Sequence, residues 1–187
     1  MIVLPASQAI KFILYASNLR KGGIAKVSIS FSGSELINIA IGIEARGITF
    51  YDIMTRSTEN AIAREVFKYL ADMEREHIKT FQDMAAEADK YQFPEAPTGE
   101  YTAYLQALVD SAVFTDDLVT SELATRASNE LEAMELAIGA EKDSILFYYE
   151  MKDIMPQRAQ PTVNKIIAEE KSHLRQLSEL KKRLAAL

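Results

Sequence analysis

The chain's only two histidines each follow a glutamate by three positions, in Glu74-x-x-His77 and Glu170-x-x-His173. Residues three apart lie on one face of an α-helix, so each motif presents a carboxylate and an imidazole to the same point in space. Carboxylate and imidazole together suit iron or manganese, and zinc as a further alternative. The two motifs therefore predict a metal site built on helices.

Two more glutamates repeat around these motifs. Glu44 and Glu141 lie 30 and 29 residues before the first residue of each motif, and each is followed seven residues later by a tyrosine, Tyr51 and Tyr148. The same pattern thus occurs twice, offset by 96 or 97 residues. Two Glu-x-x-His motifs with one glutamate from each of two further helices form the ligand set of di-metal carboxylate bundles. We expect each tyrosine to hydrogen-bond a ligand carboxylate on the opposite helix, the alternative being an aromatic core residue.

Four long segments show the apolar periodicity of amphipathic helices. They run from about Ser34 to Arg56, from Ser57 or Thr58 to Lys90, from Ser121 or Ser128 to Met155, and from Pro161 to the C-terminus. All six candidate ligands fall within the apolar stripes, whereas their neighbours Glu76 and Glu169 are expected to point elsewhere. Four buried carboxylates cannot be satisfied by two histidines, but two divalent ions would cancel their charge. This count disfavours the alternative of a metal-free bundle with buried Glu–His pairs.

The connections predict the topology. Short loops near residues 55–58 and 156–161 make the first and second helices, and the third and fourth, antiparallel neighbours. A stretch from about 91 to 120 contains Pro94, Pro97 and Gly99, is long enough to cross the bundle, and includes a short expected helix at Leu105–Phe114. The predicted fold is all-α: a ferritin-like four-helix bundle of two antiparallel hairpins joined by a long crossover.

Composition narrows the function classes. A net charge of −6 argues against nucleic acid and against an anionic membrane surface as partners. The absence of cysteine excludes disulfides, iron–sulfur clusters and thiol nucleophiles within the sequence and fits a reducing compartment, so we expect a cytoplasmic location. No apolar run is long enough to span a membrane.

Residues 1–32 are expected to be an N-terminal extension of uncertain role, with the bundle at 33–187. Three interpretations of the extension are possible: a helix or arm that packs on the bundle or on a neighbouring subunit, a secretory signal, or a segment upstream of a translation start at Val27.

From Ser34 to Leu184 the chain resembles the rubrerythrin family of the ferritin-like superfamily. The resemblance rests on the six candidate ligands and on the short sequences near them, Ile43-Glu44-Ala45-Arg46 and Phe147-Tyr148-Tyr149. It implies a non-haem di-iron centre. In that centre Glu74 and Glu170 would bridge the metals, and the terminal ligands would be Glu44 with His77 and Glu141 with His173.

Two departures from the family pattern bear on activity. Peroxide-reducing rubrerythrins usually carry a C-terminal rubredoxin domain with four cysteines, and this sequence has no cysteine. Many also have an additional glutamate one turn beyond the third-helix ligand, where this chain has Ser144, with Asp143 on a different face. The resemblance therefore leaves open whether the chain is a peroxidase.

The function expected from the resemblance is a di-iron oxidoreductase that reduces hydrogen peroxide or dioxygen. Its electrons would come from an external donor such as a rubredoxin-like protein, and a homodimer is expected. The alternatives are an iron-handling protein, which would act as a ferroxidase, an iron store or a metal binder, and an oxygenase acting on an organic substrate.

Overall fold

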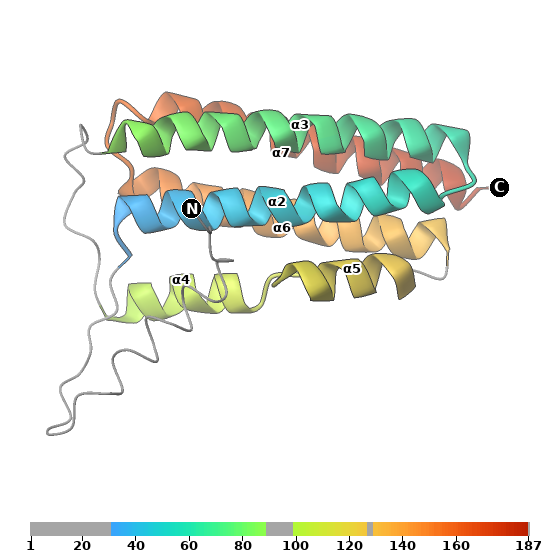
Figure 1. The fold of residues 1–187 in the computed structure, drawn as a ribbon, viewed down its shortest axis with the longest axis horizontal. Coiled ribbons are helices and arrows are strands. Elements are labelled where there is room, and N and C mark those ends of the chain that lie inside the picture. The colour runs from blue at the N-terminus through green and yellow to red at the C-terminus, as the bar shows by residue number, and fades with distance from the viewer. Residues whose placement is uncertain (1–30, 89–98, 127–128, 187) are drawn as a thin grey trace, which may run out of the picture.

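The computed structural model describes residues 31–88, 99–126 and 129–186, and all regular secondary structure in these ranges is helical. The helices are α2 (Gly33–Ser57), α3 (Ala61–Ala86), α4 (Glu100–Asp110), α5 (Asp117–Arg126), α6 (Glu130–Ile154) and α7 (Gln160–Leu184). Figure 1 shows α2, α3, α6 and α7 running side by side along the long axis. The all-α fold class is therefore confirmed.

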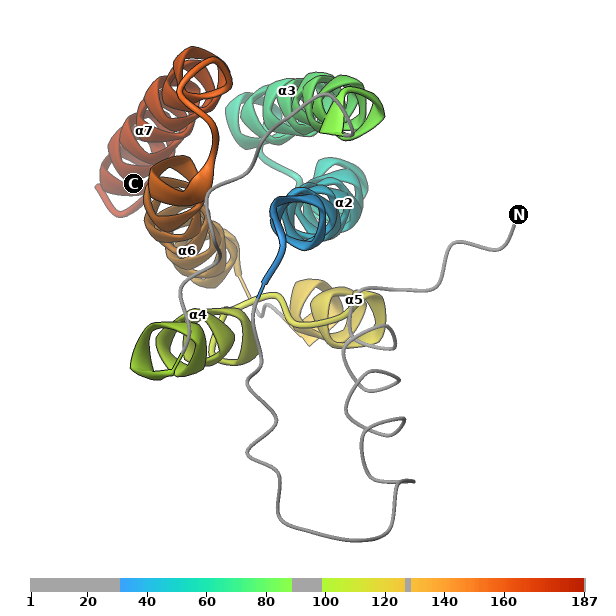
Figure 2. The ribbon, with the colours of Figure 1, turned by 90° about the vertical axis from the view of Figure 1, so that its left-hand side faces the viewer.

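The four long helices form two antiparallel hairpins, α2 with α3 and α6 with α7, and the end-on view in Figure 2 shows them as a four-helix bundle. The crossover between the hairpins carries α4 and α5, which follow one another along one side of the bundle (Figure 1). It was predicted to contain one short helix at Leu105–Phe114. The structure instead begins α4 at Glu100, ends it at Asp110 and adds α5.

Capping residues fix where the helices begin. Ser32 and Glu35 form a capping box at the start of α2: the Glu35 backbone N–H donates to Ser32 Oγ at 3.2 Å, and the Ser32 N–H donates to Glu35 Oε2 at 2.7 Å. The predicted start of the second helix at Ser57 or Thr58 is wrong. Asn60 caps α3 by accepting from two backbone N–H groups, while the Thr58 hydroxyl donates to Glu130 Oε1 at 2.8 Å.

The third long helix also begins later than predicted. Asn129 caps α6, with its Oδ1 accepting from the Glu132 N–H at 3.0 Å, and Ser121 belongs to α5. Ser128 and Lys90, the other predicted boundaries, lie outside the described residues, as do residues 1–30 of the expected extension. The α7 boundary agrees within one residue with the predicted start at Pro161, which lies in the first turn.

Two apolar clusters fill the bundle interior, one toward each end. One includes Leu36, Ile37 and Ala40 of α2, Phe81 and Met84 of α3, Phe147, Tyr148 and Met151 of α6, and Val163, Ile166 and Ile167 of α7. The other includes Phe50, Tyr51 and Met54 of α2, Phe67, Leu70 and Ala71 of α3, Met134, Ala137 and Ile138 of α6, and Leu177 and Leu180 of α7. Each helix therefore passes from one apolar cluster to the other through its middle turns, where the candidate ligands lie.

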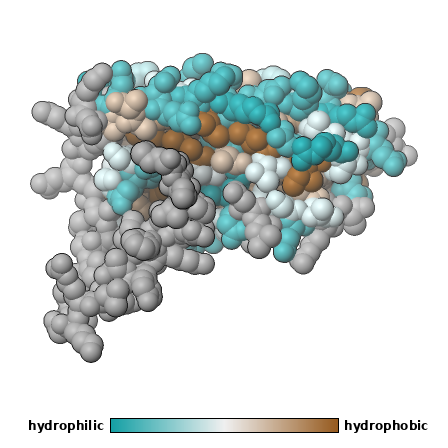
Figure 3. Space-filling model, viewed as in Figure 1, coloured by the Kyte–Doolittle hydropathy of each residue, from teal (hydrophilic) through white to brown (hydrophobic). Residues whose placement is uncertain are grey.

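The surface in the view of Figure 3 is mostly hydrophilic, with a hydrophobic band along α2. No helix within the described ranges combines the length and apolar character that crossing a membrane would require.

Candidate metal centre

The bundle brings all six predicted ligands to one level of its interior. Glu44 comes from α2, the Glu74-x-x-His77 motif from α3, Glu141 from α6, and the remaining Glu-x-x-His motif from α7. Every one of these side chains belongs to a residue that is 3% exposed or less. Helix periodicity explains the convergence, since each residue occupies the apolar stripe that faces the bundle axis.

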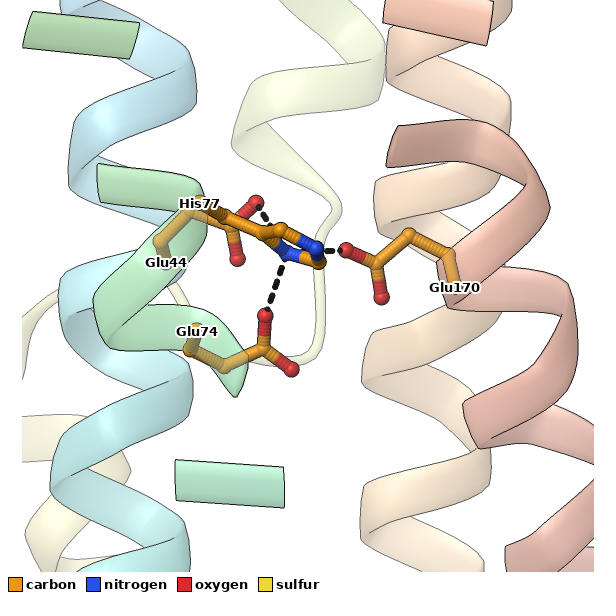
Figure 4. A group of neighbouring side chains, drawn as sticks. All are labelled: Glu44, Glu74, His77 and Glu170. Carbon is orange, nitrogen blue, oxygen red and sulfur yellow. Dashed lines mark hydrogen bonds and ion pairs between the residues drawn. The ribbon is translucent and has the colours of Figure 1, made fainter. Parts of the chain in front are cut away.

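The ligand atoms form two overlapping groups, each confined within 4.8 Å. One group is Glu44, Glu74, His77 and Glu170, and the other is Glu74, Glu141, Glu170 and His173. Figure 4 shows the first group, with His77 between carboxylates of α2, α3 and α7. Glu74 and Glu170 belong to both groups, so each carboxylate lies where it could contact two ions.

Each histidine turns Nδ1 toward three carboxylates. His77 Nδ1 lies 2.8 Å from Glu74 Oε2, 2.9 Å from Glu170 Oε1 and 3.5 Å from Glu44 Oε1. His173 Nδ1 lies 3.2, 3.5 and 3.7 Å from oxygens of Glu170, Glu74 and Glu141. One nitrogen can direct at most one proton, so it cannot satisfy three carboxylates by hydrogen bonding.

This donor set fits a pair of divalent cations. It is buried, rich in carboxylate oxygen and completed by two imidazoles, which suits iron, manganese or zinc. Buried Glu141 Oε2 has no hydrogen-bond partner among the described residues, although buried polar atoms are normally satisfied. A bound cation would supply the missing partner.

The tyrosines hydrogen-bond the glutamates crosswise. The hydroxyl of Tyr51 on α2 donates to Glu141 Oε1 on α6, and the hydroxyl of Tyr148 on α6 donates to Glu44 Oε1 on α2 at 2.5 Å. These are the hydrogen bonds that the sequence led us to expect. Tyr149, the next residue on α6, is 38% exposed and its hydroxyl accepts from Lys171 instead.

Comparison with known proteins agrees with this arrangement. The sequence model of rubrerythrin matches residues 35–181. The chain belongs to the rubrerythrin family. A solved structure from Thermotoga maritima, described as a ferritin-like diiron-carboxylate protein, is 34% identical to this rubrerythrin-family chain, with a TM-score of 0.64 over 82% of this chain and 96% of that one. A search of curated proteins gives no match.

Burial and mutual repulsion control protonation in this rubrerythrin-family site. Burial, followed by repulsion from Glu170, raises the pKa of Glu141 to about 8, and burial with repulsion from Glu74 and Glu170 raises the pKa of Glu44. Burial alone would lower the pKa of His173, but its close contacts with the carboxylates of Glu141, Glu170 and Glu74 raise it to about 12. Without metal, protons must therefore provide the positive charge that the site requires.

One residue predicted to point away from the site does not. Glu169 Oε2 lies 3.2 Å from His77 Nε2, so this carboxylate contacts a candidate ligand from the side remote from the metal positions. Its spacing gives only a partial signal: Glu169 lies four residues before His173 and therefore on the same face of α7, but the contact with His77 depends on how α7 packs against α3. Glu76 agrees with the prediction, since it is exposed and pairs with Lys79 at 2.6 Å.

A small cavity of about 40 Å³ reaches the centre from the crossover side. Its lining includes three of the glutamates (Glu44, Glu74 and Glu141) and apolar side chains of α4, α6 and the α4–α5 connection (Leu108, Phe147 and Phe114). Arg46 and Ser144 line it too, and neither was predicted to be part of the site. Ser144 Oγ donates to the Ala140 carbonyl at 3.1 Å, and Asp143, on the same wall, accepts from the Val113 N–H at 2.8 Å.

Proposed function

We propose that the protein is a di-iron carboxylate oxidoreductase that reduces hydrogen peroxide or dioxygen. The observation that carries the proposal is the pair of overlapping ligand groups that share Glu74 and Glu170. Iron is favoured among the metals that suit these ligands because the Thermotoga maritima relative is described as a diiron-carboxylate protein. Glu44 with His77 would complete one metal position, and Glu141 with His173 the other.

Bound ferrous ions would supply two electrons, one from each iron, which is the number needed to convert hydrogen peroxide and two protons into two water molecules. The chain's own residues prepare the site for this reaction. Tyr51 and Tyr148 hold Glu141 and Glu44 in fixed orientations, because each carboxylate has one oxygen occupied by a tyrosine hydroxyl. Burial and the nearby carboxylates raise the pKa of both tyrosines, so both hydroxyls remain protonated donors at neutral pH.

The surroundings of the centre favour a small, uncharged oxidant. The apolar clusters above and below the ligands exclude bulk water, and the cavity offers about 40 Å³ beside the glutamates. Such a space can admit a molecule of the size of dioxygen or hydrogen peroxide. A bulky organic substrate would require the crossover to move.

We also propose that electrons arrive from a separate rubredoxin-like protein. The sequence contains no cysteine, so the chain has no thiolate-bound iron centre of its own to pass them on.

For assembly and location we propose a homodimer in the cytoplasm. The hydrophobic band along α2 in Figure 3 supports a protein contact on that face. Light scattering of the purified protein tests the assembly.

The proposal is tested by loading the protein anaerobically with ferrous iron and mixing it in stopped flow with each oxidant. We expect two irons per chain, oxidation by hydrogen peroxide, and a single turnover unless an electron donor is added. Binding of fewer than two irons per chain contradicts the di-iron proposal. Rapid oxidation by dioxygen with no response to peroxide contradicts a peroxidase.

The second candidate is a ferroxidase or iron-storage protein, and Ser144 is the observation that favours it. Its hydroxyl is bonded back to its own helix at a position where many peroxide-reducing relatives are expected to have a carboxylate. Many irons per chain in a large cage would support storage, and oxidation of iron by dioxygen in repeated cycles without an electron donor would support a ferroxidase.

A further inference from the structure

The two histidines differ in what surrounds Nε2, the ring nitrogen that faces away from the four candidate ligand carboxylates. His77 Nε2 lies 3.2 Å from Glu169 Oε2, and Lys165 Nζ lies 3.6 Å from the other oxygen of Glu169. The partners come from α7, whereas His77 belongs to α3. The outer nitrogen of this imidazole therefore has a carboxylate acceptor that is itself paired with a cation.

The other histidine has a different environment. His173 Nε2 is buried and has no hydrogen-bond partner among the described residues, and the ring of Tyr69 meets the imidazole edge-on at 6.2 Å between ring centroids. The internal repeat makes the difference explicit. Met73 precedes Glu74 as Glu169 precedes Glu170, and Tyr69 occupies the place that corresponds to Lys165. A methionine thioether is only a weak acceptor.

This difference affects metal binding because both imidazoles direct Nδ1 at the carboxylates. For Nδ1 to bind a cation, Nε2 must carry the proton. A carboxylate that accepts this N–H fixes the tautomer and ring orientation and makes the imidazole a stronger ligand. Glu169 provides this support to His77, and nothing in the described part of the chain provides it to His173.

We propose that the two metal positions are inequivalent, with Glu169 acting as a positioning residue that makes the Glu44–His77 position the tighter one. The inference rests on the di-metal site of the proposed function. Loss of such a supporting partner typically weakens metal affinity by about 10–100-fold. We therefore expect the Glu44–His77 position to bind its ion about 10–100-fold more tightly than the Glu141–His173 position.

Cobalt(II) is a suitable probe, since its binding can be followed by visible absorption without any redox reaction. Metal-free protein is titrated with Co²⁺ to obtain the two affinities. Crystals grown with one equivalent of Co²⁺ are then examined by anomalous scattering to identify the occupied position. We expect a peak beside His77 and two separable affinities.

Variants assign the difference to Glu169. E169M places at position 169 the residue type that occurs at position 73. We expect it to weaken Co²⁺ binding at the Glu44–His77 position by about 10–100-fold, so that one equivalent of Co²⁺ occupies the two positions more equally. E169Q keeps an uncharged acceptor and should lose less. E76M is the matched control, because Glu76 is an exposed carboxylate adjacent to His77 that does not contact the ring, and it should leave both affinities unchanged.

M73E offers a carboxylate to the outer nitrogen of His173, and it should therefore strengthen Co²⁺ binding at the Glu141–His173 position. Equal occupancy of the two positions at one equivalent of Co²⁺ in the unmodified protein would overturn the inference, as would an E169M variant with the original affinities and order. Failure of both positions to bind Co²⁺ would instead contradict the proposed di-metal site itself. Circular dichroism melts separate these outcomes from unfolding of a variant.

Discussion

At the scale of single residues, two tyrosine hydroxyls determine how two of the ligand carboxylates are presented. Replacing Tyr51 or Tyr148 with phenylalanine removes the donor to Glu141 or Glu44 and leaves a buried carboxylate oxygen unsatisfied. We expect Y51F and Y148F each to weaken metal binding by about 10–100-fold and to lower the unfolding free energy by about 1–3 kcal/mol. Competition with a chromophoric chelator and denaturant melts measure the two effects.

Tyr149 provides the matched control for this prediction, since it adjoins Tyr148 on the same helix but faces outward. Y149F removes a hydroxyl that contacts only Lys171 among the interactions described above, so metal affinity should remain unchanged. If Y148F and Y149F behaved alike, the tyrosine–glutamate hydrogen bond would have no role in metal binding.

The ligand carboxylates should also divide into two classes. Glu74 and Glu170 belong to both ligand groups, whereas Glu44 and Glu141 each belong to one. We expect E74A and E170A to lose both metals because each removes a contact to both ions, and E44A and E141A to retain one metal per chain. Elemental analysis after loading and desalting provides the count. Retention of one metal by E74A would exclude a bridging role for that residue.

At the scale of elements, Arg46 connects the bundle to the crossover. Its Nε donates to the Phe114 carbonyl at 2.9 Å, between α4 and α5, and the side chain is buried beside the cavity. We expect R46A to lower the unfolding free energy by about 1–3 kcal/mol, since it leaves a carbonyl without this donor. It should also speed amide hydrogen exchange near residues 111–116. K68A, which removes an exposed pair with Asp72, should change stability by no more than about 0.5 kcal/mol.

The long helices could be predicted from sequence because their information is local and repeated. Apolar periodicity and the duplicated Glu, Tyr and His spacing indicated four bundle helices and placed the six candidate ligands at one level. The residues at the helix ends were harder to assign, because Thr58 and Asn60 are both good capping residues. The choice between them depends on Glu130, a residue distant in sequence whose carboxylate accepts from the Thr58 hydroxyl and the Asn60 N–H.

Glu169 and the crossover show a second limit of sequence reasoning. Whether a charged residue next to a ligand points inward depends on how α7 packs against α3, and this packing brings Glu169 to His77. In the crossover, α4 contacts α6 and α5 contacts α2, and no short-range periodicity encodes these contacts. Non-local packing therefore determined the parts of the structure that sequence reasoning missed.

At the scale of the whole molecule, the metal centre concentrates negative charge between two apolar clusters. This charge must be balanced either by bound cations or by bound protons. Burial raises the pKa of Glu141 from its ordinary value near 4.5 to about 8, and carboxylate contacts raise the pKa of His173 from 6.5 to about 12. Glu170 opposes this trend, because hydrogen bonds from His173 and His77 outweigh burial and repulsion from Glu74 and lower its pKa.

These shifts predict how the stability of metal-free protein depends on pH. Between about pH 4.5 and 8 the folded state retains a proton on Glu141 that the unfolded chain has released. Above pH 6.5 the folded state also retains a proton on His173 that the unfolded chain has lost. The folded state then binds more protons, so the unfolding free energy falls as pH rises through this range. Below about 4.5, the lowered pKa of Glu170 reverses the sign for that residue. Metal-free protein should therefore lose thermal stability progressively from pH 5 to 9.

Metal-loaded protein should respond differently, because cations that replace the protons carry charge that does not titrate away. Its melting temperature should exceed that of metal-free protein at pH 7, with the gap widening toward pH 9 and narrowing toward pH 5 as protons compete for the ligands. Melting curves of both forms across this range provide the test. Equal melting temperatures at pH 7 would mean that protons satisfy the four buried carboxylates as well as metal does, and the charge argument for the site would then be wrong.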